Sequence, residues 1–231
     1  MILGLDTTTE HLHLALVGGQ GTWTRRVTVD RGASASVKLL PAMAGLLKEA
    51  GAVMADLTGV CACVGPGGFT SLRLGVATAE GLAVTGLPTW GFSAFALRAE
   101  ALKVAGTKGS FWILLDGQRQ EAFHQKWELD PLTDASKRPM ADLEGLIGDE
   151  PWWAPEAVVP KLRTHLASEP LSLPDEGEVM LSGLVNLCGR LPFSEPEVPL
   201  HPFYLRETDA ELNFPNLSAH LSEAHRRGIA R

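Results

Sequence analysis

The sequence has little of what several classes of protein need. Its 231 residues contain three cysteines, too few for a disulfide framework. No apolar run reaches the length of a membrane span, and no cationic leader-like segment precedes Ile2. Cys61 and Cys63 would share one face of a strand, where we expect small buried hydrophobes. We therefore expect a globular protein of the cytoplasm.

Positive charge is also scarce. The formal net charge is -7, with 20 lysines and arginines against 27 aspartates and glutamates. Non-specific nucleic-acid binding is mostly electrostatic, so an acidic chain is a poor candidate for gripping a phosphate backbone alone. The basic residues Arg226, Arg227 and Arg231 are too few to change this. Any contact with nucleic acid would run mainly through a partner.

Motifs of common catalytic sites are missing as well. No two histidines are spaced as His-x-x-x-His, which argues against a helical zinc pair. His11 and His13 project from one side of a strand and could chelate weakly, although a solvent-facing or partly covered pair is the better interpretation. Gly-x-Ser-x-Gly is absent, so a hydrolase triad is unsupported. We predict no catalytic residue and no metal site.

The first 105 residues predict one lobe of mixed α/β structure. Apolar residues recur at two-residue spacing in three early segments, which favours an antiparallel meander, and at helical spacing between Leu39 and Ala50. His11 to Leu16 alternates like a strand with one buried face, and Pro41 should lie near the start of its helix. The expected strands are 2–8, 11–16, 22–29, 60–64 and 89–91, and the expected helices are 39–50 with caps at Ser34 or Ser36, 70–84 and 93–104.

A smaller, reduced second lobe is expected over residues 106–231. A strand at 111–115 ends in Asp116 and could pair with 121–129. Five prolines between 130 and 160 make long regular elements improbable there. The remaining expectations are helices at 161–167, 178–190 and 216–227, and an extended segment at 192–202.

A glycine-rich turn is the most specific local feature. The run Gly65-Pro66-Gly67-Gly68-Phe69-Thr70-Ser71-Leu72-Arg73-Leu74-Gly75 follows a strand and opens a helix. Glycines allow close backbone approach, and a helix start offers free N–H groups to an anion. No Gly-Lys-Ser/Thr follows, so this is not a P-loop. Phosphate binding and a plain tight turn both remain open.

This run resembles the Gly-Pro-Gly-Ser-Phe-Thr-Gly-Leu-Arg-Ile-Gly signature of the TsaB (YeaZ) family. Further segments resemble the family in the same order: Ile2 to Thr8, Lys38 to Pro41, Asp116 to Glu121, and Tyr204-Leu205-Arg206. The resemblance is strong to about residue 125 and patchy beyond. Ala35-Ser36-Val37 departs from the family's His-Ser-Glu, which puts any contact of that histidine or glutamate in doubt.

The resemblance implies the actin-like fold, in which two related lobes flank a cleft. TsaB-like proteins bind TsaD, a catalytic subunit, and work with the ATPase TsaE. Together they transfer a threonylcarbamoyl group to the adenosine beside the anticodon of certain tRNAs. The chain itself would then bind no cofactor, would meet tRNA only through the complex, and could form a homodimer when alone. The competing hypotheses are an autonomous actin-like ATPase or kinase, a glycoprotease-type hydrolase, and a self-associating scaffold.

The candidate site is therefore a remnant of a phosphate loop. It comprises Asp6, Thr7, Thr8, Gly65, Gly67 and Gly68. A carboxylate there could hold Mg²⁺ through water, but we favour a simpler role in which Asp6 and the threonines satisfy their own turn. No second phosphate loop is evident, since the segment from Asp116 to Arg119 is a weak match to a glycine-rich phosphate loop.

The helix expected at 70–84 carries a stripe of small residues, namely Ser71, Gly75, Ala79 and Ala83. The stripe could pack this helix onto its own sheet or let a partner approach. In the family, this helix and the preceding one meet TsaD. The implied interface is Val37, Leu40, Ala44, Leu47, Phe69, Leu72, Gly75, Val76 and Ala79. A large charged residue at Gly75 or Leu72 is then predicted to abolish binding.

Overall fold

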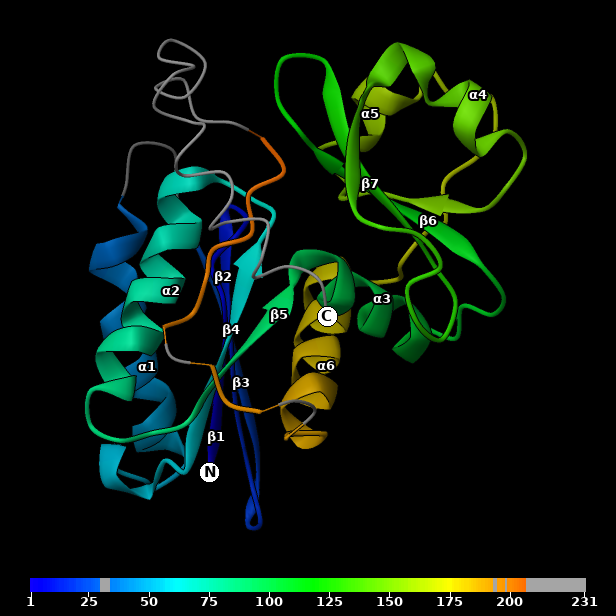
Figure 1. The fold of residues 1–231 in the computed structure, drawn as a ribbon. Coiled ribbons are helices and arrows are strands. Elements are labelled where there is room, and N and C mark those ends of the chain that lie inside the picture. The colour runs from blue at the N-terminus through cyan, green and yellow to red at the C-terminus, as the bar shows by residue number, and fades with distance from the viewer. Residues whose placement is uncertain (30–33, 193–194, 198, 207–231) are drawn as a thin grey trace, which may run out of the picture.

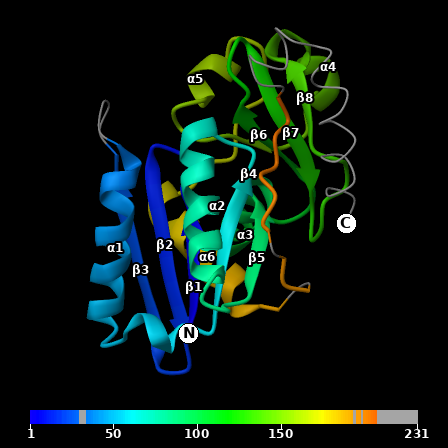
Figure 2. The ribbon, with the colours of Figure 1, turned by 60° about the vertical axis from the view of Figure 1, so that its left-hand side comes forward.

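The computed structural model describes residues 1–29, 34–192, 195–197 and 199–206. Two sheets form the framework, and helices cover the first sheet on both faces (Figures 1 and 2). The first sheet contains β1 (Ile2–Asp6), β2 (His11–Gly18), β3 (Gly21–Thr28), β4 (Gly59–Gly65) and β5 (Thr89–Ser93). Its helices are α1 (Ala35–Glu49), α2 (Phe69–Ala83), α3 (Ala94–Val104) and α6 (Glu176–Gly189). A short 3-10 helix, Met54–Asp56, precedes β4.

The first sheet has the order β3-β2-β1-β4-β5. β1, β2 and β3 pair antiparallel as a meander, while β4 and β5 join β1 in parallel. Parallel neighbours need crossover connections, and α2 supplies the one between β4 and β5. The predicted order of three strands followed by alternating helices and strands is confirmed.

The second sheet has the order β8-β7-β6-β9. Its elements are β6 (Phe111–Asp116), β7 (Glu121–Trp127), β8 (Ser136–Pro139), β9 (Trp152–Trp153), a 3-10 turn (Met140–Asp142), α4 (Glu144–Ile147) and α5 (Val159–Leu162). The predicted β6–β7 pairing is confirmed, as is the lack of long elements among the prolines. The helix expected at 161–167 is wrong in extent. α5 ends at Leu162, and residues 163–165 form turns.

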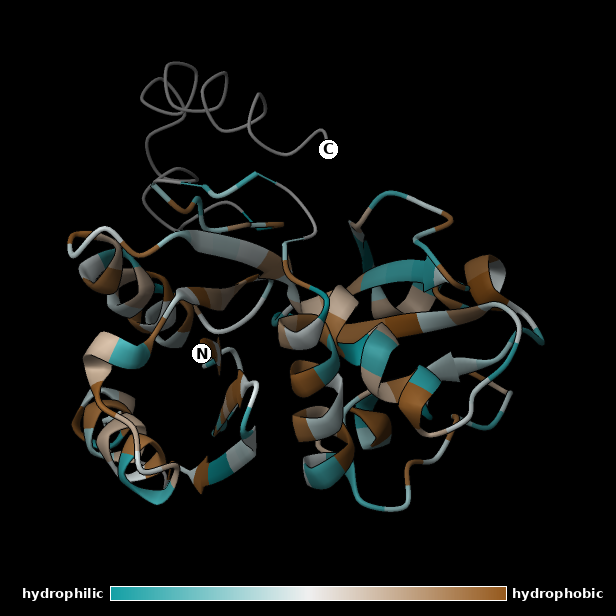
Figure 3. Cartoon of the chain, turned by 90° about the horizontal axis from the view of Figure 1, so that it is seen from below, coloured by the Kyte–Doolittle hydropathy of each residue, from teal (hydrophilic) through white to brown (hydrophobic). Residues whose placement is uncertain are grey.

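Both faces of β2 are buried, which corrects the expectation of one buried face. The leucines of β2 pack under α1 and α2, and Ala15 and His13 lie under α6 on the other side. Figure 3 shows hydrophobic positions along helices on both sides of this sheet. β3 alternates clearly, with Trp23 and Val27 half-buried and its threonines, at positions 22, 24 and 28, exposed.

Helix α6 returns to the first sheet. It packs against β1, β2 and α3, and it does so closely, since a Cβ at Gly4 would overlap the Cys188 sulfur. Gly183 faces the backbone of Ala101 at a similar close approach. The prediction assigned everything after residue 105 to the second lobe. α6 departs from that boundary because its apolar face covers the first sheet, so the second sheet is built from the residues between α3 and α6.

One local expectation also needs revision. Pro41 lies inside α1 and not near its start, because the helix begins at Ala35. The Val37 carbonyl therefore has no N–H donor at position 41. The segment expected to be extended at 192–202 contains no helix or strand among its described residues. The helix expected at 216–227 lies outside the described residues. In the part of the chain that the structure describes, no helix is long and apolar enough to cross a membrane.

Candidate functional site

A cavity of about 440 Å³ opens between the two lobes, where β1 ends. The β1–β2 turn, the glycine-rich turn before α2, and α3 contribute Thr8, Gly67 and Arg98. The β6–β7 turn and the start of α6 contribute Asp116 and Glu176 from the other side. The structure thus brings the sequence-predicted glycine turn and β1 terminus to one cleft.

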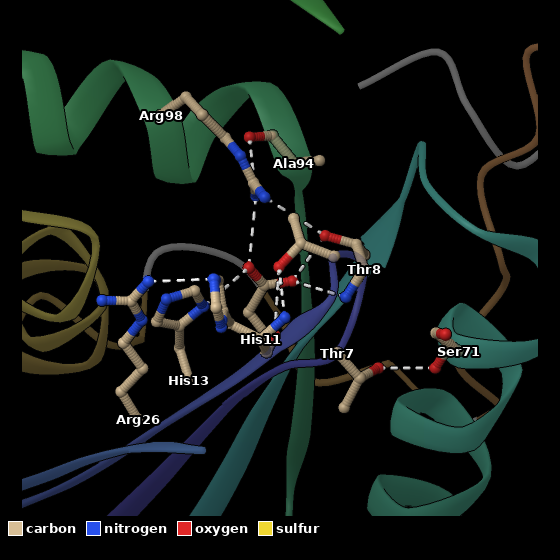
Figure 4. Close-up of polar contacts among 10 residues, drawn as sticks. Thr7, Thr8, His11, His13, Arg26, Ser71, Ala94 and Arg98 are labelled. Carbon is tan, nitrogen blue, oxygen red and sulfur yellow. Dashed lines mark hydrogen bonds and ion pairs between the residues drawn. The ribbon is translucent and has the colours of Figure 1, made fainter. Parts of the chain in front are cut away.

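Asp6 lies beneath the cavity and is fully buried. One carboxylate oxygen, Oδ1, accepts hydrogen bonds from the Thr8 N–H at 3.0 Å and the Thr8 hydroxyl at 2.6 Å (Figure 4). The other, Oδ2, lies 3.3 Å from Arg98 Nη1 and 3.6 Å from His13 Nδ1. The expected turn contact between Asp6 and the threonines is confirmed.

The pKa of Asp6 reports this environment. Burial alone would raise the pKa, but the Arg98 guanidinium, His13 and the Thr8 hydroxyl oppose it, and the net pKa lies well below the ordinary aspartate value. The carboxylate is therefore ionised and paired within the chain. A carboxylate already paired with a buried guanidinium is a poor ligand for the water shell of Mg²⁺.

Arg98 is the residue that sequence reasoning missed. It is 2% exposed, it donates to the Ala94 carbonyl and to the Thr8 hydroxyl, and it projects from α3 into the cavity floor. An arginine within the apolar run Ala94–Val104 was the available signal, because buried arginines are rarely found without a partner.

The glycine-rich turn is packed against the β1–β2 turn. A Cβ at Gly67 would lie 2.6 Å from Thr8 Cβ, and the Gly68 N–H donates to the Thr8 carbonyl at 3.3 Å. One turn later, the Thr7 hydroxyl donates to the Ser71 carbonyl at 2.6 Å. Close packing between two loops thus accounts for Gly67 without any phosphate. Gly65 is explained separately, since its φ is 110° and a Cβ there would meet the Phe203 carbonyl.

Carboxylates line the opposite wall. Asp116 is paired with Lys161 at 2.6 Å. Glu176 accepts a hydrogen bond from the Glu156 N–H at 3.0 Å. Burial raises the pKa of Glu176, and this effect exceeds the lowering by the hydrogen bond from the Glu156 N–H. The Glu156 carboxylate adds a smaller rise, and Arg98 and His13 oppose it. A triphosphate placed here would face these negative groups at close range.

The two strand histidines differ in environment. His13 is buried at 3% exposure, which corrects the expected solvent-facing pair, because α6 covers this side of the sheet. His11 is half-buried, and its Nε2 lies 2.9 Å from Arg26 Nη2. No group of three or more metal-binding side chains occurs among the described residues.

The proposed interface residues divide into two sets. Leu47, Leu72, Gly75, Val76 and Ala79 are buried in the core of the chain itself. The small stripe therefore packs α2 onto its own sheet, and a Cβ at Gly75 would lie 2.5 Å from the Thr7 hydroxyl. The prediction that these buried residues form a partner surface is therefore wrong. A charged residue at Gly75 or Leu72 would disturb the fold of the chain itself, so it cannot test partner binding. The remaining residues are exposed: Val37, Leu40, Ala44 and Phe69.

An apolar groove of about 920 Å³ runs between α1 and α2. Its lining includes Leu40, Ala44, Leu74, Ala77 and Leu82. Leu40 is 61% exposed, and Val37 beside it is 70% exposed. Both helices lie on the same side of the first sheet (Figure 1).

Two of the segments that carry the family resemblance meet in space. Arg73 stacks on the Phe69 ring, with its guanidinium carbon 3.8 Å from the ring centre. The same side chain donates through Nε to the Tyr204 hydroxyl at 2.9 Å. The glycine-rich signature and the Tyr-Leu-Arg segment are therefore joined by a contact that spans 131 residues of sequence.

Comparison with known proteins agrees with this architecture. Residues 33–141 match the family model of TsaD, tRNA N6-adenosine threonylcarbamoyltransferase. An uncharacterized protein of Mycobacterium tuberculosis is 28% identical over 220 residues, covering 91% of this chain and 93% of that protein. YeaZ from Pseudomonas aeruginosa superposes with a TM-score of 0.68 at 21% identity, covering 88% of this chain and 99% of YeaZ. Component A of (R)-2-hydroxyglutaryl-CoA dehydratase from Acidaminococcus fermentans gives a TM-score of 0.50 at 11% identity, covering 81% of this chain and 96% of the other.

The two mixed sheets and the cleft between them define an α/β protein of the actin-like class. Within that class, residues 33–141 resemble the TsaD family model, and the fold as a whole is similar to that of YeaZ.

Proposed function

We propose that this chain is a non-catalytic subunit that binds a TsaD-like protein and thereby supports threonylcarbamoyl transfer to tRNA. A TsaE-like ATPase would complete the complex, and tRNA would be held mainly by the partners. The proposal rests first on the groove between α1 and α2. Large exposed apolar side chains gathered in one groove are typical of a protein interaction site.

The shape of the groove favours a helical partner. Ala44, Ala77 and Gly81 line it with small groups, and Leu40 and Leu74 line it with large ones. Small residues let a helix backbone approach closely, while the leucines offer apolar area to bury. The partner would then place one or two amphipathic helices across α1 and α2. A second copy of this chain could use the same surface when the partner is absent.

The charges of the cleft support a role without catalysis. Arg98 already pairs with Asp6, the carboxylate that would be expected to organise Mg²⁺ in an actin-like ATPase. Glu156 and Glu176 stand where a triphosphate would need neutral or cationic groups. ATP would accordingly be used by the complex through its other subunits.

The first test is a substitution in the groove. Leu40→Glu should weaken co-purification with the TsaD-like subunit of the same organism at least tenfold, since it would bury a carboxylate in an apolar contact. Val84→Glu is the matched control, because Val84 is 88% exposed at the end of α2 and lies outside the groove lining. Circular dichroism must first show that both variants are folded. If both then co-purify equally well with the TsaD-like subunit, the groove is not the binding surface.

The role itself is tested by reconstitution. Unmodified tRNA is incubated with ATP, threonine, bicarbonate, the threonylcarbamoyl-adenylate synthase, TsaD and TsaE, with and without this chain. We expect modified nucleoside only when the chain is present. The competing hypothesis of an autonomous ATPase or hydrolase predicts turnover by the chain alone, lost in Asp6→Asn. Such turnover would contradict the non-catalytic role even if the groove binds a partner.

A further inference from the structure

The α1–α2 groove leaves large apolar side chains uncovered in the part of the chain that the structure describes. Leu40, Val53 and Met54 all line the groove, and all three are exposed. Exposed apolar side chains gathered in one groove mark an interaction site, because contact with water is unfavourable for them. The free protein is therefore stabilised by an apolar segment that covers the groove before a partner arrives.

The described chain ends at Arg206, next to α2. The stretch that precedes Arg206 runs beside α2 in both ribbon views (Figures 1 and 2). It is held there by the Tyr204 hydroxyl, which accepts a hydrogen bond from Arg73 Nε at 2.9 Å. Leu74, the neighbour of Arg73, lines the groove. Residues 207–231 are therefore tethered beside the surface that lacks a cover.

The sequence that follows supplies an apolar stripe of the right kind. The helix expected at 216–227 begins with Asn216, a favoured N-cap residue. Leu217, Leu221 and Ala224 then recur at intervals of four and three, which places them on one helical face. An isolated helix of this length is marginal in water, because most helical stability comes from packing an apolar face. This segment therefore needs an apolar surface to be stable as a helix.

The connection is long enough for this segment to reach the whole groove. Residues 207–215 join Arg206 to the expected helix, and an extended chain of that length spans up to about 30 Å. α2 has 15 residues and is therefore about 22 Å long. Tethering keeps the segment at a local concentration on the order of millimolar, so even weak apolar contacts suffice to hold it.

We infer that residues 216–227 occupy the α1–α2 groove of the same chain and leave it when a partner binds. Leu217 and Leu221 would be buried among the leucines of the groove, and the small side chains of Ala44 and Ala77 would let the helix approach closely. The inference rests on the proposed function only for the identity of the partner. It adds that the chain competes for its own interaction surface, so the apparent affinity for the partner is reduced in proportion to the fraction of molecules whose groove is open.

Amide hydrogen exchange of the full-length protein, measured by mass spectrometry without any partner, tests the docking. Amides in 216–227 should exchange about tenfold faster in Leu40→Glu than in the wild type, because a carboxylate in the groove disfavours the apolar contact. Val84→Glu is the matched control, since Val84 is exposed at the end of α2 and lies outside the groove lining, so exchange should stay slow. Equal exchange rates in the wild type and Leu40→Glu would overturn the inference. Protection that disappears on dilution would also overturn it, because the occupant would then be the segment of a second copy.

Substitutions in the segment test the competition. Leu217→Glu combined with Leu221→Glu releases the segment and leaves the groove unchanged, so this double variant should bind the TsaD-like subunit about tenfold more tightly than the wild type. Ser218→Glu combined with Ser222→Glu is the matched control, because it adds the same two charges at the same spacing outside the apolar stripe. Its affinity for the TsaD-like subunit should equal that of the wild type.

The inference and the proposed function fail in different ways. If the leucine double variant binds the TsaD-like subunit no more tightly than the wild type does, the competition is overturned while the partner role stands. If neither protein binds that subunit, the proposed function fails, and the exchange rates of 216–227 alone support or overturn the docking.

Discussion

The pairing of Asp6 with Arg98 yields a quantitative prediction about stability. Arg98→Met keeps the length and apolar stem of the side chain but removes its charge. Asp6 would then remain fully buried beside His13 and Thr8 without its guanidinium. Breaking a buried ion pair by removing one partner costs about 3–5 kcal/mol, because the other charge is left uncompensated. We expect a loss of that size in the free energy of unfolding at pH 7, or roughly 6–20 °C in melting temperature.

The pH dependence of the free energy of unfolding tests whether the Asp6–Arg98 ion pair causes this loss. In the native chain the pKa of Asp6 is depressed below its unfolded value, so its stabilising contribution is complete above about pH 4 and is lost as the pH falls towards the folded pKa. In Arg98→Met, burial would dominate and raise the pKa of Asp6 above its unfolded value. The defect should therefore shrink as the pH falls from 7 through that raised pKa.

Urea denaturation followed by circular dichroism at pH 7 and pH 5 measures both effects. The double variant Asp6→Asn with Arg98→Met is the control, since it removes both charges and should recover part of the stability lost in the single variant. If Arg98→Met loses less than about 1 kcal/mol, or if its defect is the same at both pH values, the ion pair does not hold the cleft floor together.

Two further predictions concern packing. Gly75→Leu should lower the free energy of unfolding by about 1–3 kcal/mol, because its side chain would overlap Thr7; urea denaturation measures this, and an unchanged midpoint would contradict the close approach. Tyr204→Phe removes the acceptor for Arg73 and keeps the ring near Phe69, so we expect the free energy of unfolding to fall by about 0.5–1.5 kcal/mol. Tyr204→Ala, which also removes the ring, should lose more. An unchanged free energy of unfolding in Tyr204→Phe would show that the hydrogen bond contributes nothing.

The sequence predicts the first lobe well because its elements are encoded locally. β3 alternates, α2 begins beside glycines, and Ser93 caps α3 by accepting a hydrogen bond from the Ala96 N–H. These signals lie within a few residues of the structure that they specify. The same locality explains why the β6–β7 pair could be predicted but the extent of α5 could not, since prolines and turns carry little periodic signal.

Burial on the second face of the sheet could not be predicted in this way. His13 alternates with leucines as an exposed residue would, and it is covered by α6, which begins more than 160 residues later. Arg98 stands out as a charge in a mostly apolar helix, but its partner Asp6 can be identified only once α3 is packed against β4 and β5. The candidate site was therefore predicted in its glycines and Asp6, and missed in Arg98 and in the burial of His13.

Helix α2 belongs to both candidate sites, and this governs how they can be tested. Gly68 and Ser71 at its start border the cavity, while Leu74, Ala77 and Thr78 one turn later line the groove. Gly75, between them, contacts Thr7 in the turn that holds Asp6. A change on the buried side of α2 would shift both sites at once and assign neither. Leu40 on α1 lines the groove and Glu176 on α6 lines the cavity, so substitutions at these two positions separate the roles of the two sites.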